Sequence, residues 1–72
     1  MHIEYTAHAW DQMTRRQITQ AEVEHVLRHP FLKGISRTTG NVIYLGRQKG
    51  RKIIVVVAPG SSPPRVITAG DL

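Results

Sequence analysis

The spacing of apolar residues changes at Pro30, and this change most constrains how the 72-residue chain can fold. Before Pro30, apolar residues recur three and four positions apart, as on one face of an amphipathic helix. After Pro30, short apolar or alternating runs are separated by glycine- and proline-containing breaks, which is typical of β-strands. We therefore expect an α+β fold, with the helices first and the strands after them, in a single domain spanning residues 1–72.

The first expected helix begins after Thr6, whose side chain suits an N-cap. Ala9 and Met13 are four positions apart and form its core stripe. The helix should end near Arg16 or Gln17. The alternating segment 2–5 ahead of it is a candidate for a short N-terminal strand.

The second expected helix has a stronger start signal. Thr19 and Glu22 form a capping box, in which each side chain reaches the other residue's main-chain N–H. Its apolar stripe then follows the helical spacing, at Val23, Val26 and Leu27. Pro30 disfavours helical geometry at His29 and should end the helix. A tight connection makes the two helices a helical hairpin.

Four strands are expected after Pro30, at residues 31–37, 41–47, 52–58 and 65–69. The breaks between them are short, which favours an antiparallel meander. We therefore predict the helical hairpin on one face of a three- or four-stranded antiparallel sheet.

The segment Ile53–Val57 is apolar at every position, which is typical of a central strand covered on both faces. The helices should cover one face, and the chain is too short to cover the other. Either Ile54 and Val56, or the alternate set at 53, 55 and 57, should then lie at a homodimer interface or on a surface for a protein partner. The alternative is shielding by Tyr44 and the stems of arginine side chains.

The net charge of the chain indicates which kinds of molecule it could bind. Ten Lys and Arg residues against five Asp and Glu residues give a net charge of +5, and seven of the ten are arginine. Arginine binds phosphate with two parallel hydrogen bonds, so RNA or another nucleic acid is a candidate partner. The alternative is that the basic surface binds no polyanion.

The amino-acid composition argues against cysteine-dependent sites and against a membrane-spanning or secreted protein. The chain has no cysteine, which rules out disulfides, a thiolate nucleophile and cysteine-bound zinc. The longest apolar run, residues 53–58, is too short to cross a bilayer, and no signal peptide is visible. We expect a cytoplasmic protein with no membrane association.

The first helix carries a candidate site. His8, Gln12 and Arg16 follow one another at four-residue spacing. His8 lies in the first turn, where the helix dipole favours a neutral imidazole suited to general base catalysis. The alternative is that His8 only packs its ring at the edge of the sheet. Arg16 could clamp a phosphate, whereas Arg15 is spaced to pair with Asp11.

A basic turn adds further candidates. Together with the helix residues Gln12 and Arg15, this turn could form a groove that binds a nucleic-acid backbone. Its cations are Arg47, Lys49, Arg51 and Lys52. Thr68 offers a hydroxyl on the last strand. Trp10 and Tyr5 offer stacking surfaces, although core packing is the usual role of a single tryptophan.

Metal chemistry has little support in the sequence. His25 and His29 are four positions apart, but no third ligand stands nearby and Pro30 disturbs their turn. There is no glycine-rich phosphate loop and no paired-carboxylate site. We expect no metal and no cofactor, so a nuclease built on this chain would work without metal.

The motif residues together resemble a bacterial family, the domain of unknown function 4258. Its pattern is similar to HAxxRMxxRGI, then xxEVxxVLxxP, then a closing Val-Ile-Thr element. The matching residues are His8, Ala9, Met13, Arg16, Ile18, Glu22, Val23, Val26, Leu27, Pro30 and Val66–Thr68. Gln12 stands where the pattern has arginine, and Gln17 stands where it has glycine.

The resemblance implies a distant relation to the fold of RelE-type toxins, barnase, EndoU and the tRNA-cutting colicins. Nucleases of that fold cleave RNA without metal, by attack of the 2′-hydroxyl. One hypothesis is therefore a toxin-type endoribonuclease, with His8 as general base or acid, Arg16 and Arg51 on phosphate and Thr68 positioning the scissile group. One alternative is a non-catalytic module that binds RNA or a protein partner. Another is a dimeric structural or regulatory protein.

Overall fold

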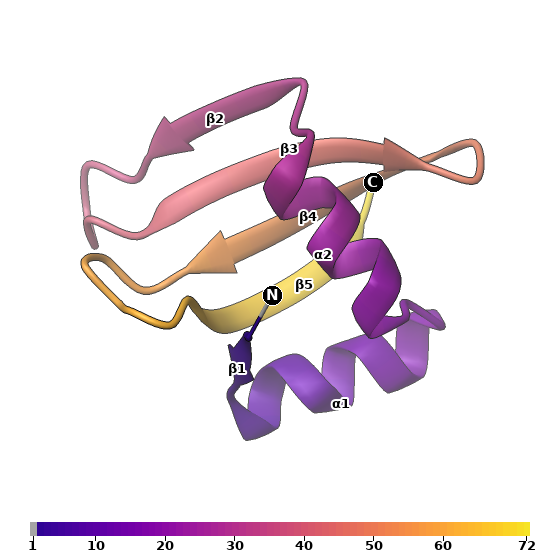
Figure 1. The fold of residues 1–72 in the computed structure, drawn as a ribbon, viewed down its shortest axis with the longest axis horizontal. Helices are drawn as coiled ribbons and strands as arrows, with labels where there is room; N and C mark the ends of the chain where they lie inside the picture. The colour runs from indigo at the N-terminus through magenta and orange to yellow at the C-terminus, as the bar shows by residue number, and fades with distance from the viewer. Residues whose placement is uncertain (1) are drawn as a thin grey trace.

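The computed structural model describes residues 2–72, which form two helices and one five-stranded sheet (Figure 1). Both helices pack on one face of the sheet, whose strands lie in the order β1-β5-β4-β3-β2. The α+β prediction is confirmed. The elements are β1 (Glu4–Tyr5), α1 (Ala7–Arg16), α2 (Gln20–Arg28), β2 (Leu32–Ile35), β3 (Val42–Gln48), β4 (Arg51–Val57) and β5 (Arg65–Asp71).

Helix α1 begins as predicted. The Thr6 hydroxyl accepts a hydrogen bond from the Ala9 N–H at 3.0 Å and donates one to the Ile67 carbonyl of β5 at 2.9 Å. Thr6 thus caps the helix and fixes its start against the sheet. The helix ends at Gln17, which takes up the left-handed conformation with φ 55° and ψ 48°.

Helix α2 has the predicted capping box. The Glu22 N–H donates to the Thr19 hydroxyl at 3.1 Å, and the Thr19 N–H donates to the Glu22 carboxylate at 2.9 Å. His29 caps the other end, directly ahead of Pro30. Both ends follow from local sequence signals alone.

The sheet departs from the prediction at its edges. β2 to β5 form the predicted antiparallel meander, but β1 pairs parallel with β5, which makes the sheet mixed. β1 is also shorter than the predicted 2–5. The β3–β4 turn needs only Lys49 and Gly50, both with positive φ as in the two-residue turns that suit strand twist, so β3 and β4 each extend toward it.

The core lies between the sheet and the helices. The alternate residues Ile53, Val55 and Val57 of β4 are buried with Ala9 and Met13 of α1. From α2, Val23 and Val26 join the same cluster.

Ile54 and Val56 are only half-buried and lie on the face without helices, here called the open face. The structure thereby decides which of the two predicted sets the helices leave uncovered.

Gly46 allows α2 to approach the sheet closely. A Cβ at this position would lie 2.8 Å from Cγ2 of Val26, closer than side chains tolerate. The absence of a side chain on β3 therefore sets the depth at which α2 packs.

Candidate functional site

The predicted row His8–Gln12–Arg16 runs along α1 beside β5. The helix starts where the Thr6 N–H donates to the Val66 carbonyl, and it ends where Arg16 pairs with Asp71 at 3.0 Å. His8 and Arg16 are exposed, and Gln12 is partly buried. His8 and Arg16 are roughly 12 Å apart along the helix axis, at 1.5 Å per residue.

The structure does not bring the three predicted catalytic residues together. Thr68 lies opposite Val56 in the sheet register, which places it on the open face. Arg16 instead reaches Asp71, which lies opposite the core residue Ile53. Within residues 2–72, the imidazole of His8 has no hydrogen bond or ion pair.

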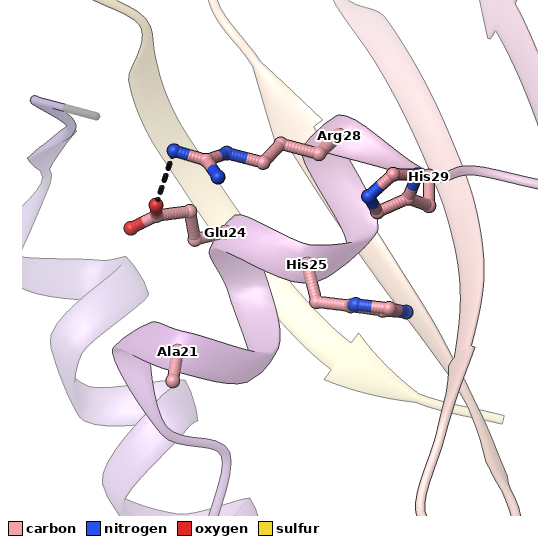
Figure 2. A pocket seen from close by; sticks show the side chains of 5 residues that line it. All are labelled: Ala21, Glu24, His25, Arg28 and His29. Atoms are coloured by element: carbon pink, nitrogen blue, oxygen red, sulfur yellow. Dashed lines mark ion pairs between the residues drawn. The ribbon is translucent and has the colours of Figure 1, made fainter.

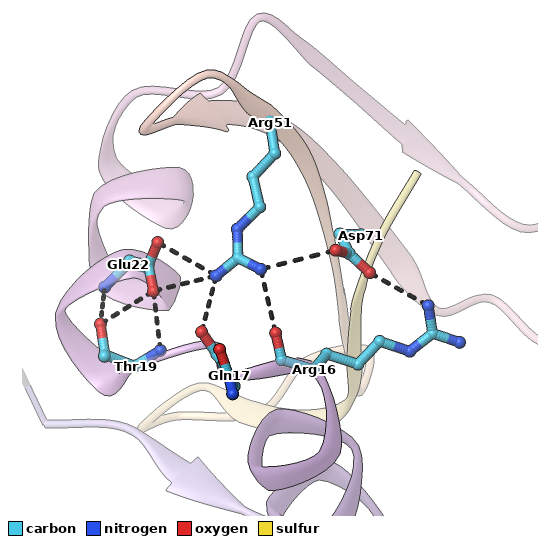
Figure 3. Close-up of polar contacts among 6 residues, drawn as sticks. All are labelled: Arg16, Gln17, Thr19, Glu22, Arg51 and Asp71. Carbon is cyan, nitrogen blue, oxygen red and sulfur yellow. Dashed lines mark hydrogen bonds and ion pairs between the residues drawn. The ribbon is translucent and has the colours of Figure 1, made fainter.

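The half-buried guanidinium of Arg51 is bound by groups of the protein itself (Figure 3). Its guanidinium donates to the carbonyls of Arg16 and Gln17, at 2.9 Å and 2.7 Å. These are carbonyls at the end of α1, where a cation is favoured by the helix dipole. The same guanidinium lies 3.3 Å from the Glu22 carboxylate and 3.5 Å from the Asp71 carboxylate. Binding of phosphate by Arg51 would require an exchange of these hydrogen bonds.

The two carboxylates beside Arg51 have shifted acidities. The N–H of Thr19 donates to Glu22 and lowers its pKa; burial opposes this, and the hydrogen bonds from Arg51 reinforce it. The hydrogen bond from Arg16 lowers the pKa of Asp71, with a further contribution from the charge of Arg51. Both groups are therefore held as carboxylates.

Ion pairing is uneven over the chain. Every one of the five carboxylate side chains pairs with an arginine: Glu4 with Arg65, Asp11 with Arg15, Glu22 with Arg51, Glu24 with Arg28, and Asp71 with Arg16 and Arg51. Five cations in residues 2–72 have no such partner, and they carry the net charge of +5: Lys33, Arg37, Arg47, Lys49 and Lys52. Among the described lysines and arginines, the unpaired charge therefore lies within residues 33–52.

Three of the five, Arg47, Lys49 and Lys52, gather at the β3–β4 turn and are here called the hairpin cluster. Arg47 and Lys52 lie directly opposite each other in the register, and Lys49 is in the turn between their strands. Like charges directly opposite on neighbouring strands destabilise a sheet. A bound anion would relieve this repulsion, so the cluster is suited to phosphate.

The other two unpaired cations lie apart from the cluster. Lys33 of β2 is opposite Tyr44, and its amine lies 5.3 Å from the centre of that ring. Arg37 is in the β2–β3 connection, at the end of β3 farthest from the hairpin cluster. Arg15, another predicted contact, forms an exposed pair with Asp11 at 3.1 Å.

Phe31 lies beside Arg47 of the hairpin cluster, a position that was not predicted from the sequence. Its side chain is 51% exposed, and the guanidinium carbon of Arg47 lies 5.3 Å from the centre of its ring. The stacking surfaces named from the sequence, Tyr5 and Trp10, instead pack on each other at 5.0 Å. The available signal was the position of Phe31 directly after Pro30, where an aromatic residue meets the margin of the sheet.

A family model supplies the comparison with known proteins. The model described as Domain of unknown function (DUF4258) matches residues 5–71. The chain belongs to this family. No curated protein and no solved structure matches it. In this DUF4258 protein the matched span includes both helices, the hairpin cluster and all of β5.

A shallow hollow of about 270 Å³ lies over α2 of this DUF4258 protein, lined by Ala21, Glu24, His25, Arg28 and His29 (Figure 2). The two imidazole rings are 5.2 Å apart, and Arg28 pairs with Glu24 at 2.9 Å. Residues 2–72 contain no group of three or more side chains placed to hold a metal ion. Neither described helix is long and apolar enough to cross a membrane.

Proposed function

We propose that this protein binds RNA through the hairpin cluster without cleaving it. The observation that carries the proposal is the ion pairing. Arginines elsewhere in residues 2–72 neutralise all five carboxylates, whereas Arg47, Lys49 and Lys52 stay unpaired at one end of the sheet. A row of phosphates is the ligand that best offsets such a concentration of charge.

The expected relation to a ribonuclease fold favours RNA over other polyanions, and the site geometry favours binding over cleavage. A general base must lie within hydrogen-bond reach of the proton that it removes, next to a group that stabilises the developing charge. His8 is two helical turns from Arg16, whose charge is balanced by Asp71, and Thr68 lies on the open face. The endoribonuclease is therefore the weaker proposal.

The test is the salt dependence of binding to a short single-stranded RNA. Each phosphate contact adds about −0.7 to the slope of log K against log salt, so three cations give a slope of about −2. Lys52→Gln should reduce the steepness of the slope by about 0.7. Arg65→Gln is the matched control, because it removes the same charge at the opposite end of the sheet, where Arg65 pairs with Glu4.

The outcomes separate the candidates. Absence of binding at low salt, or an equal effect of Arg65→Gln and Lys52→Gln, would overturn the hairpin cluster as the RNA site. The RNA is recovered and examined after each titration. Cleavage that disappears in His8→Ala would instead establish the nuclease proposal.

The open face supports a second candidate function, association with a protein. Ile43 and Leu45 lie on this face with Ile54 and Val56, all of them half-buried and covered by neither helix. Leu32, opposite Leu45, is 55% exposed. A second copy of this chain or another protein could cover this apolar face.

A further inference from the structure

Phe31 is fixed at the margin of the sheet although half of its surface contacts water. Its N–H donates to the Leu45 carbonyl at 2.8 Å, directly ahead of the first residue of β2. This main-chain hydrogen bond to β3 holds the residue beside the strand that carries Arg47. The ring is thus positioned by the sheet but is not part of the core cluster.

The ring and the hairpin cluster belong to one surface. The Arg47 guanidinium lies 5.3 Å from the ring centre, and Arg47 is also the cross-strand neighbour of Lys52. A guanidinium over an aromatic ring is weakly hydrated and keeps its edge available for hydrogen bonds to phosphate. A half-exposed aromatic ring and a planar cation therefore lie together, with Lys52 opposite the cation and Lys49 in the turn that follows.

We propose that Phe31 and Arg47 form a base-stacking platform that makes the hairpin cluster prefer single-stranded to duplex nucleic acid, an inference that rests on the proposed RNA-binding function. An unpaired base can stack on the phenyl ring or on the guanidinium while its flanking phosphates contact Lys49 and Lys52. In a duplex the faces of the bases are covered by their neighbours, and only the phosphates remain for contact.

Other aromatic residues do not offer this combination. Trp10 is 44% exposed, but it packs on Tyr5 and follows the capped start of α1. Tyr44 has Lys33 over its ring and packs against the core. Among the described residues, Phe31 is the aromatic side chain that adjoins the hairpin cluster.

The test compares four probes on the full chain: a short single-stranded RNA, the DNA of the same sequence, the RNA duplex and heparin. Wild-type protein should bind the single strands more tightly than the duplex. Phe31→Ala should weaken single-strand binding by about tenfold, as for loss of one stacked base, and leave duplex and heparin binding unchanged. Phe31→Leu keeps an apolar side chain without an aromatic face and should show the same loss.

Ile35→Ala is the matched control, because Ile35 is an apolar residue of β2 that is 70% exposed and distant from the hairpin cluster. Circular dichroism verifies that each variant is folded. Stacking does not read the sugar, so loss of binding to both RNA and DNA single strands supports the platform.

The two proposals fail differently. If no probe binds, the RNA-binding function is wrong and the platform falls with it. If all probes bind with the same salt slope, and neither Phe31 variant changes the preference, the hairpin cluster binds polyanions and the platform is overturned.

Discussion

Gln17 has a backbone geometry that favours glycine. It ends α1 with φ 55°, in the left-handed region where a Cβ costs about 1–2 kcal/mol. Its main-chain carbonyl, which accepts from Arg51 at 2.7 Å, would be kept in a glycine variant. Glycine is also the residue that the family pattern carries at this position.

We expect Gln17→Gly to raise the free energy of unfolding by about 1 kcal/mol. Removal of the Cβ relieves steric strain in the left-handed conformation, and this gain exceeds the entropic cost of ordering a glycine on folding. For a domain of this size that corresponds to an increase in Tm of roughly 4–8 °C. Thermal unfolding followed by circular dichroism measures it. Thr14→Gly, in regular helix, should lower the Tm, and a lower Tm for Gln17→Gly would contradict the explanation.

Residues with local partners were predictable, and those with distant partners were not. The caps made by Thr6, Thr19 and Glu22 act on main-chain groups within three positions, so these roles follow from the sequence. The hydrogen bond from Thr6 to the Ile67 carbonyl joins groups 61 positions apart and does not. For Arg51 the basic neighbours in the sequence predict a phosphate contact. Its actual partners lie 20 to 35 positions away, a relation that only the fold creates.

The junction of the two helices depends on an ion pair between Arg51 of β4 and Glu22 of α2. Arg51 of β4 donates to the carbonyls at the end of α1 and pairs with Glu22 in the first turn of α2 (Figure 3). Glu22 is only 3% exposed, so its charge is shielded little by solvent. Protonation of Glu22 therefore weakens the contact between both helices and the sheet.

The direction of the pH dependence follows from the lowered pKa of Glu22. In the folded protein the pKa of this carboxyl is lower than 4.5, which is its ordinary value in the unfolded chain. Its contribution to stability is complete above that value and is lost as the pH falls through the lowered folded pKa. Asp71 acts in the same direction.

We expect the free energy of unfolding to hold down to about pH 5 and to fall below it. Glu22→Gln keeps an acceptor for the capping box but removes the charge, so it should cost about 2 kcal/mol at pH 7 and flatten the acid dependence. Urea unfolding at a series of pH values measures both effects. A Glu22→Gln protein with the wild-type acid dependence would exclude Glu22 as the source.

At the level of elements, the antiparallel meander could be predicted because its turns are short and the strands that it joins are adjacent in sequence. β1 could not be assigned a partner, because it contributes two residues and pairs with Arg65 and Val66, sixty-one positions along the chain. The proximity of Phe31 to Arg47 could not be predicted for a related reason. Phe31 meets Arg47 through the pairing of β2 with β3, not through sequence spacing.

The molecule as a whole has two unlike faces. The helices cover one, and the open face is apolar in its middle and basic at the hairpin cluster. RNA binding and protein association would use different parts of this face. Self-association can therefore be tested without removing a cation.

If a second copy covers the open face, sedimentation should show a mass above 8.1 kDa that increases with concentration. Ile54→Lys places a charge in the middle of that face and should return the protein to a monomer. Ile35→Lys introduces the same charge on β2, where the register places Ile35 in line with Val57 on the helix side. A wild-type mass of 8.1 kDa at every concentration would rule out this interface.

The position of β5 between β1 and β4 has a consequence for synthesis on the ribosome. β5 lies between β1 and β4, and α1 packs against it. β1 and α1 are synthesised first, but they cannot make these contacts until residues 65–71 have been synthesised. Until then the apolar stripe of α1 lacks its main packing surface, since α1 packs chiefly against β5. The nascent chain therefore completes its core only after residues 65–71 have been translated, and this domain folds as one unit rather than from its first residue onward.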